Sequence, residues 1–257
     1  MRYSRSSVKI VLVVLLMVVA GCGGMLGDDT DREPYAVESD DDESEELIPG
    51  LTNEGVTSSS TLWLAHVDGV SDTAYERSDR TTIRDENGTL SSARETQTTV
   101  ADGGSPVLTV FESTDEWPQS AIWYGENTTV SRHVDENGSV NLNIHSDLSP
   151  PDPTLAVDPL SLYDAVDTVT VNGSDEMTRY HLTGTGDVSG YENATFEVVL
   201  DENGIVKEFV FEGETTHDGE PMTREFYTNF ASVDESIHLE EPDWVKEAQE
   251  ESPDSNE

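Results

Sequence analysis

The sequence predicts an α+β fold, a single domain built on an antiparallel β-sheet, and three observations lead to this prediction. The tetrapeptide DENG occurs at 85–88, 135–138 and 201–204, and its Asn-Gly pair suits the positive φ angles of tight hairpin turns. Around these turns apolar and polar residues alternate with period two, which is typical of a strand with one buried face. Two helix-start signals give the order helix, strands, short helix, strands.

The N-terminal segment is typical of a secretory signal peptide. Arg2, Arg5 and Lys9 precede an uninterrupted apolar run over 10–20. This run is about half the roughly 20 residues that a helix needs to cross a bilayer. We therefore expect residues 1–21 to be a cleaved signal peptide.

Cys22, the single cysteine of the chain, follows this segment. The sequence Val19-Ala20-Gly21-Cys22 resembles the lipobox of lipoproteins, in which the cysteine is lipidated and becomes the mature N-terminus. The alternative is an incidental or buried cysteine beside a short signal anchor. Because one acyl chain holds a protein only marginally, we expect two chains or a diether lipid on Cys22, anchoring the protein to the outer face of the cell membrane.

The mature chain is strongly acidic. Removal of residues 1–21 leaves ten basic residues against 54 acidic ones, a formal charge of −44. This charge excludes nucleic acid as a partner and disfavours adsorption to anionic headgroups. Both an intrinsically disordered protein and a folded protein in concentrated salt could carry it. Four Trp, eight Tyr and six Phe in strand-like patterns favour a folded extracellular protein of a halophile.

The composition divides the mature chain into three parts. Eleven carboxylates lie between Asp28 and Glu46 without apolar periodicity, so residues 22–46 are expected to be the lipidated cysteine and a disordered acidic tether. The composition is globular over residues 47–245, for which we expect one domain. Residues 246–257 are expected to be a disordered acidic tail.

Within the domain, the helix signals are local. Residues 57–60 can cap a helix that runs to residue 70 and carries Leu62 and Trp63. Asp158 is a suitable N-cap and Pro159 suits the first helical position, which predicts a second helix over 159–166 with Leu160 and Tyr163. The strands near the C-terminus place one apolar set on a single face, made of Phe196, Val198, Phe209, Phe211, Phe226 and Phe230.

Sequence motifs for catalysis are absent. The chain contains no nucleophile elbow, P-loop, dinucleotide fingerprint or HExxH motif, and its six histidines are scattered singly. We expect no enzymatic activity, no catalytic residue, no metal site and no cofactor; the alternative is a site assembled only in three dimensions. Five Asn-X-Ser/Thr sequons are candidates for N-glycosylation, at Asn87, Asn127, Asn137, Asn172 and Asn193.

The lipobox, the acidic tether, the Leu-Trp-Leu-Ala-His segment at 62–66 and the block over 195–244 that ends in Pro-x-Trp together resemble an uncharacterised family of haloarchaeal lipoproteins. The ending also resembles the last strands of LolA-like and LppX/LprG-like lipoprotein carriers. The second resemblance implies a curved antiparallel half-barrel of roughly nine to eleven strands, with helices over its concave face. Such a fold encloses a cavity for acyl chains.

Two functions follow as expectations. The protein binds or carries an apolar ligand such as a lipid, or it is a structural or protein-interaction component of the cell envelope with a filled core. The helices over 57–70 and 159–166 decide between them. If they only roof the concavity, an apolar pocket of several hundred Å³ remains. This pocket would be lined by Leu62, Trp63, Leu160, Tyr163, Phe196, Val198, Phe209, Phe211, Phe226 and Phe230.

Overall fold

The computed structural model describes residues 45–114, 119–174 and 177–251. The expected signal peptide, Cys22 and nearly all of the expected tether lie outside the described residues. The described residues all belong to one compact unit. Within its described part, no helix is both long and apolar enough to cross a membrane.

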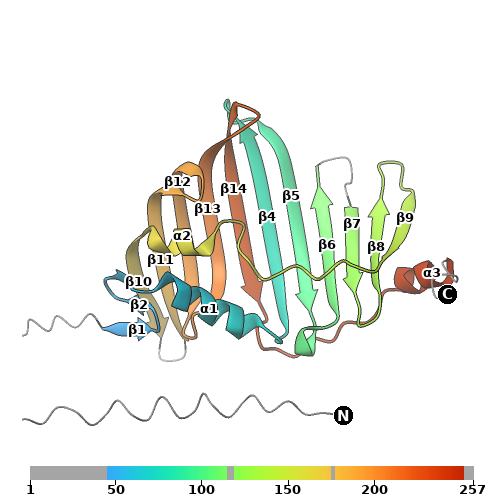
Figure 1. Cartoon of the computed structure of the whole chain (residues 1–257), viewed down its shortest axis with the longest axis horizontal. Helices are drawn as coiled ribbons and strands as arrows, with labels where there is room; N and C mark the ends of the chain where they lie inside the picture. Colours follow the sequence, from blue (N-terminus) through green and yellow to red (C-terminus); the bar gives the residue numbers. More distant parts are fainter. Residues whose placement is uncertain (1–44, 115–118, 175–176, 252–257) are drawn as a thin grey trace, which may run out of the picture. The chain divides into compact units, whose positions relative to one another are not determined.

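An antiparallel sheet of eleven strands dominates this unit and confirms the predicted sheet (Figure 1). It is built from two meanders. One runs outward from β4 to β9, and the other runs from β10 back to β14, which pairs with β4. The strands are β4 (Tyr75–Asp85), β5 (Leu90–Val100), β6 (Val107–Ser113), β7 (Gln119–Tyr124), β8 (Thr129–Val134), β9 (Val140–His145), β10 (Val166–Ser174), β11 (Met177–Val188), β12 (Tyr191–Asp201), β13 (Val206–His217) and β14 (Glu220–Ala231).

The three DENG copies form hairpin turns, as predicted. In the first, the Asp85 carboxylate accepts hydrogen bonds from the backbone N–H groups of Asn87 (2.9 Å) and Thr89 (2.8 Å). Gly88 has a φ of 77°, and the Asn before it is not among the residues with positive φ. Only the glycine is therefore left-handed, which is the geometry of a turn closed by a glycine bulge rather than of a two-residue turn.

Two helices begin at the predicted caps. Helix α1 (Ser59–Val70) starts after Ser58, whose hydroxyl accepts a hydrogen bond from the Thr61 N–H (3.3 Å). Helix α2 (Pro159–Asp164) starts after Asp158, whose carboxylate accepts from the Ser161 N–H (2.9 Å). A small sheet of β1 (Glu46–Ile48), β2 (Leu51–Thr52) and β3 (Gly55–Val56) precedes α1, and a short 3₁₀ turn, η1 (Asp102–Gly104), joins β5 to β6.

The C-terminal segment differs from the sequence expectation. Residues 243–251, part of which was expected to be a disordered tail, form helix α3 (Asp243–Glu251). Val245 and Ala248 lie three positions apart, so they share a helix face. They pack against Trp123 and Val130 of the sheet. Two apolar residues in an acidic segment are too weak a pattern to predict a helix from the sequence. The contact with the sheet stabilises the helix instead.

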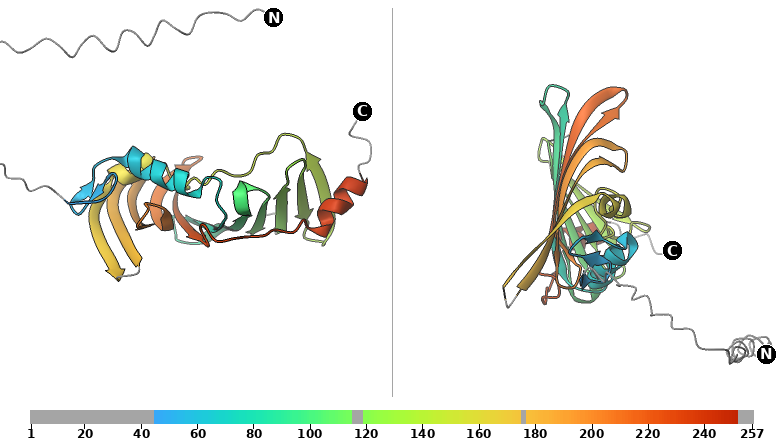
Figure 2. Two further views of the ribbon diagram at one scale, coloured as in Figure 1. Left: turned by 90° about the horizontal axis from the view of Figure 1, so that it is seen from below. Right: turned by 90° about the vertical axis from the view of Figure 1, so that its left-hand side faces the viewer.

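The sheet has an inner face, defined as the face that α1 and α2 cover, and an outer face opposite to it (Figure 2). The first half of the sheet, β10–β14 with β4, buries its inner face in the main core. In the second half, β5–β9, the outer face of β6–β9 packs against α3, and on the inner face Val100, Val107 and Tyr124 join the main core. The expectation of helices over one face therefore holds for α1 and α2 alone.

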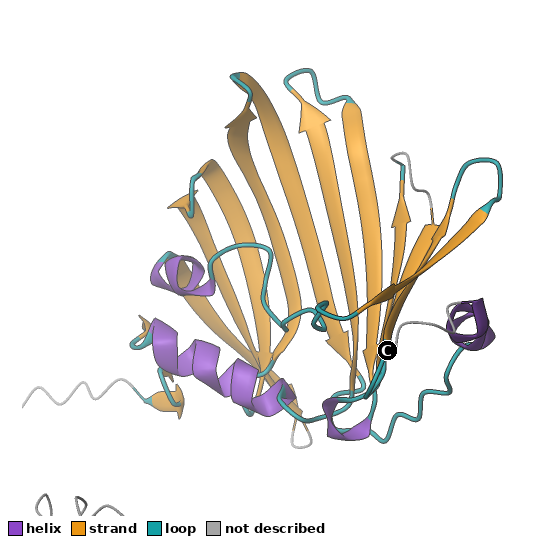
Figure 3. Ribbon diagram, turned by 45° about the vertical axis from the view of Figure 1, so that its right-hand side comes forward, coloured by secondary structure: helices purple, strands orange, loops and turns teal. Residues whose placement is uncertain are grey.

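The connection from β9 to α2, residues 146–158, crosses the inner face (Figure 3). Leu155 and Val157 are buried in the main core. The Arg77 guanidinium donates a hydrogen bond to the Asp152 carbonyl (3.2 Å). Together with α2, this connection joins β9 and β10, the two outermost strands of the sheet.

Candidate functional site

The ten residues predicted to line an apolar pocket lie together at the inner face of the first half, but most of them form a packed core. Eight are no more than 7% exposed, and Trp63 packs against them; Leu160 is 41% exposed. Helices α1 and α2 thus fill the concavity here. Two of the ten, Phe211 and Phe226, also border a hollow of about 250 Å³ with residues of the outer face.

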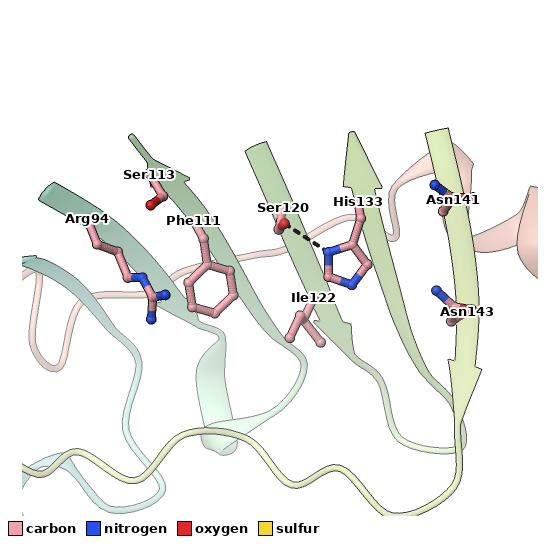
Figure 4. A pocket seen from close by; sticks show the side chains of 8 residues that line it. All are labelled: Arg94, Phe111, Ser113, Ser120, Ile122, His133, Asn141 and Asn143. Atoms are coloured by element: carbon pink, nitrogen blue, oxygen red, sulfur yellow. Dashed lines mark hydrogen bonds between the residues drawn. The ribbon is translucent and has the colours of Figure 1, made fainter. Parts of the chain in front are cut away.

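A larger groove of about 730 Å³ lies on the inner face of the second half, where neither α1 nor α2 covers the sheet. This volume falls within the usual range for small-molecule sites. We call it the inner groove. The strands β5 to β9 each contribute at least one lining residue (Figure 4): Arg94, Phe111, Ser113, Ser120, Ile122, His133, Asn141 and Asn143.

The inner groove has polar side chains at both ends and a mixed middle, where Ser120 and His133 accompany two apolar residues. Arg94 and Ser113 pair across β5 and β6 at one end, and Asn141 and Asn143 of β9 stand at the other. Phe111 and Ile122 lie between them. Since neighbouring strands are about 4.8 Å apart, the four steps from β5 to β9 span about 19 Å.

His133 stands in the groove with a fixed ring. Its Nδ1 lies 2.9 Å from the Ser120 hydroxyl oxygen on the neighbouring strand. Deeper on the same face, the His145 Nε2 lies 2.8 Å from the Ser131 hydroxyl oxygen. Both histidine–serine pairs place hydrogen-bonding groups on this face.

The charge of this face differs from that of the chain as a whole. Roughly one residue in five is acidic over the full sequence. The strand register shows no Asp or Glu on the described inner face of β5–β9. Its residues are Ser92, Arg94, Thr96, Thr98, Val100, Val107, Thr109, Phe111, Ser113, Ser120, Ile122, Tyr124, Thr129, Ser131, His133, Asn141, Asn143 and His145.

Arg94 also differs from the arginines of the neighbouring strand. On β4, Arg77, Arg80 and Arg84 each form an ion pair of 2.8 Å with a carboxylate. Arg94 is exposed and has no ion-pair or hydrogen-bond partner among the described residues. Its guanidinium lies beside Phe111 at the open end of the groove (Figure 4).

A second hollow, of about 270 Å³, lies beyond the C-terminal end of α1 and is acidic. Asp72, Asp102, Asp234 and Glu235 are among its lining residues. The Asp102 carboxylate accepts hydrogen bonds from the Ile237 N–H (2.9 Å) and the Ser236 hydroxyl (2.8 Å), which lower its pKa. No group of three or more potential metal ligands was found within the described ranges.

Two buried polar residues belong to the core rather than to a site. His66 donates from Nε2 to the Pro153 carbonyl (3.2 Å), and its Nδ1 accepts from the Val206 N–H (3.3 Å). Burial lowers the pKa of His66 to about 4, so the ring is neutral. Burial likewise raises the pKa of Tyr163.

The five sequon asparagines are all exposed. Asn87 and Asn137 lie in DENG turns, Asn127 lies in the turn between β7 and β8, and Asn172 lies on the edge strand β10. The Asn193 side chain donates a hydrogen bond to Glu214 (2.9 Å). Each of the other four side-chain amides is therefore open to solvent.

The inner groove was missed at the level of the sequence. Its residues come from five strands, and each of them is of a type that is common at solvent-exposed positions of a strand. A signal was nevertheless present, because alternate positions along these strands contain no carboxylate in a chain rich in them. Finding it requires the strand register, which periodicity does not provide.

No family model matches this chain, and no curated protein matches it. Among solved structures it is similar to a DUF1329 family protein from Desulfovibrio piger, with 14% identity and a TM-score of 0.26 over 70% of this chain and 93% of that one. It is also similar to MucB in complex with MucA(peri), with 12% identity and a TM-score of 0.14 over 72% and 100% of the chains. Scores this low carry no argument about family or function.

Proposed function

We propose that the protein is a lipid-anchored extracellular protein that binds a polar ligand in the inner groove. The observation that carries this proposal is the contrast between a filled apolar concavity and an open groove on the same face. Nine of the ten expected pocket residues pack in or against the core, which leaves little room for an acyl chain among them. Six of the eight groove residues are polar.

Binding is favoured over catalysis by the groove's chemistry. Hydroxyl, amide, imidazole and guanidinium groups offer hydrogen bonds to a ligand, and Phe111 and Ile122 offer an apolar floor. A few well-placed polar groups over an apolar surface are typical of ligand sites.

A matched pair of substitutions on β7 tests the binding proposal. Ser120→Trp fills the inner groove, whereas Gln119→Trp places the same ring on the outer face. The probes are neutral and acidic oligosaccharides and short peptides at millimolar concentration, with the thermal midpoint of the mature chain as readout. A binding probe raises the midpoint of wild type and Gln119→Trp but not that of Ser120→Trp. Equal responses from both variants would refute a groove ligand.

The anchor rests on Val19-Ala20-Gly21-Cys22. We expect Cys22→Ser to yield an unlipidated protein that partitions into the aqueous phase on detergent separation. Retention of the variant in the membrane fraction to the wild-type extent would contradict the lipoprotein proposal.

The charge of −44 on the mature chain supports a role in concentrated salt, where like charges are screened within about 3 Å. The domain should unfold cooperatively in multimolar KCl and lose stability on dilution. An unchanged thermal midpoint between low and high salt would contradict this part of the proposal.

A structural or interaction role in the envelope is the second candidate. It is favoured by apolar side chains on the outer face beside α3, where Val140 is 49% and Ile144 is 40% exposed. This candidate predicts that Ser120→Trp leaves the protein's cellular role intact.

A further inference from the structure

We propose that the ligand of the inner groove is an anionic oligosaccharide. This inference rests on the proposed function of the same site and names the class of its ligand. It is argued from the charge of the face, the guanidinium at one end, the length of the groove and the chemistry of its floor.

The charge of the inner face favours an anion. Elsewhere the sheet presents carboxylates freely: on the outer face of the first half these include Glu76, Glu197, Glu208, Glu212 and Glu225. An anionic ligand would be repelled by such a surface. The described inner face of β5–β9 has none of these groups, and its charged or chargeable residues are Arg94, His133 and His145.

Arg94 supplies the partner that an anionic group needs. A guanidinium presents a planar fork of N–H donors that matches the two oxygens of a carboxylate or sulfate. The arginines of β4 already have such partners within the chain, and Arg94 has none among the described residues. Its place beside Phe111 puts the charged group of a ligand next to an apolar surface.

The length and floor of the groove favour an oligosaccharide. A span of about 19 Å is several sugar rings long. A pyranose ring has one face of C–H groups, which suits Phe111 and Ile122, and a rim of hydroxyls, which suits Asn141 and Asn143. A peptide would instead present backbone amides. The strands β5–β8 offer it only side chains, because their backbone groups are paired on both sides within the sheet, and only the edge strand β9 has unpaired backbone groups.

The test is isothermal titration calorimetry on the mature chain carrying Cys22→Ser, at the lowest salt that keeps it folded. The probes are tetragalacturonate, a neutral galactose tetramer and a hexaglutamate peptide. Tetragalacturonate should bind, and Arg94→Gln should weaken it about tenfold or more, the effect of losing a charge-assisted bidentate contact. The matched control is Arg80→Gln, which removes an exposed arginine from the outer face of β4 and should leave the affinity unchanged.

Three results would overturn the inference. They are tighter binding of the neutral tetramer, tighter binding of hexaglutamate, and an affinity for tetragalacturonate that Arg94→Gln leaves unchanged. If a neutral or peptide probe binds and Ser120→Trp abolishes it, only the ligand class is wrong. If no probe binds the wild type, and Ser120→Trp and Gln119→Trp respond alike to the whole probe set, the groove itself is not a binding site.

Discussion

The two halves of the eleven-stranded sheet pack against helices on opposite faces. In the first half Phe209, Phe211 and Phe230 point inward under α1 and α2. In the second half Trp123 and Val130 point outward under α3. The pairing of β4 with β5 shifts register only between Ile83 and Arg84, at one end of the strands, and is regular from Tyr75 to Ile83. The β14–β4 and β5–β6 pairings show no shift. The change of face therefore comes from which residues of each strand are apolar.

This exchange explains why the protein can have a full core and an open groove on the same face. A strand with period-two alternation has one apolar and one polar face, and the parity of its residues decides which is which. In the second half, the apolar alternate residues point to the outer face and pack against α3. Its inner face is then polar around the groove, whereas Val100, Val107 and Tyr124, at the opposite ends of β5–β7, are buried in the main core.

The largest expected effect tests which alternate residues of the first half face inward. Phe209 is fully buried on the inner face, and its neighbour Val210 is 41% exposed on the outer face. Phe209→Ala should lower the free energy of unfolding by about 3–5 kcal/mol, through lost burial and the cavity left behind. Val210→Ala should change it by about 0.5 kcal/mol or less. Denaturant titration of both variants measures this, and equal losses would mean that the parity is misassigned.

A second effect concerns pH and belongs to the first half. The unfolded His66 binds a proton near pH 6.5, and the folded ring does so only near pH 4. The neutral ring therefore contributes fully to the free energy of unfolding above pH 6.5, and this contribution is lost as the pH falls from 6.5 to 4. The total loss is about 3 kcal/mol. Protonation would also turn the Nδ1 acceptor of the Val206 N–H into a donor.

Stability curves between pH 7 and 4 for wild type and His66→Gln measure the effect. Carboxylate titration is common to both proteins and cancels in their difference. Parallel curves would show that His66 is not the group responsible.

The third prediction tests how firmly α3 holds the second half. Val245 is fully buried against the outer face, and Glu247 of the same helix is exposed. Val245→Ala should cost about 2 kcal/mol, from about 0.8 kcal/mol per buried methylene and a small cavity. Hydrogen exchange over 243–251 should accelerate in this variant. Glu247→Ala is the control, and the same exchange rate in both variants would indicate a helix that does not depend on the sheet.

The smallest expected effect is at a helix cap. The Ser58 hydroxyl accepts the Thr61 N–H at the start of α1, the main cover of the first half. Ser58→Ala should cost about 1 kcal/mol, and Ser58→Asp should restore most of it. Thermal unfolding of the two variants measures the difference, and no loss in Ser58→Ala would mean that the cap is dispensable.

Local signals predicted much of the fold. The caps at Ser58 and Asp158, the three DENG turns and the shared face of Phe209 and Phe226 all follow from spacing and turn chemistry. The part that could not be predicted is the face of the sheet that each alternating set of residues occupies. Val140, Leu142 and Ile144 alternate clearly in the sequence, but whether they face α1 or the opposite side depends on register across six strands.

The groove likewise depends on how distant elements of the chain are placed relative to one another. Its uncovered state results from the short α2, from the path of residues 146–158 and from the docking of α3 on the outer face, none of which a local pattern contains. The strand residues expected to line the apolar pocket share the inner face. Only the packing of Leu62 and Tyr163 shows how fully that face is covered.

The pairing of β14 with β4 has a consequence for the order of folding. Phe230 lies opposite Arg77, so this contact joins residues 153 positions apart, and long-range pairing of this kind slows folding. The β4–β9 meander is synthesised well before β14, which begins 75 residues after β9 ends. Until then β4 is an open edge, a template for aggregation. Its charged residues, Arg77, Asp79, Arg80 and Arg84, protect that edge during the interval. Of these, Arg84 later pairs with Glu225 of β14, whereas Arg80 pairs with Glu95 of β5 and Arg77 with Asp79 of the same strand.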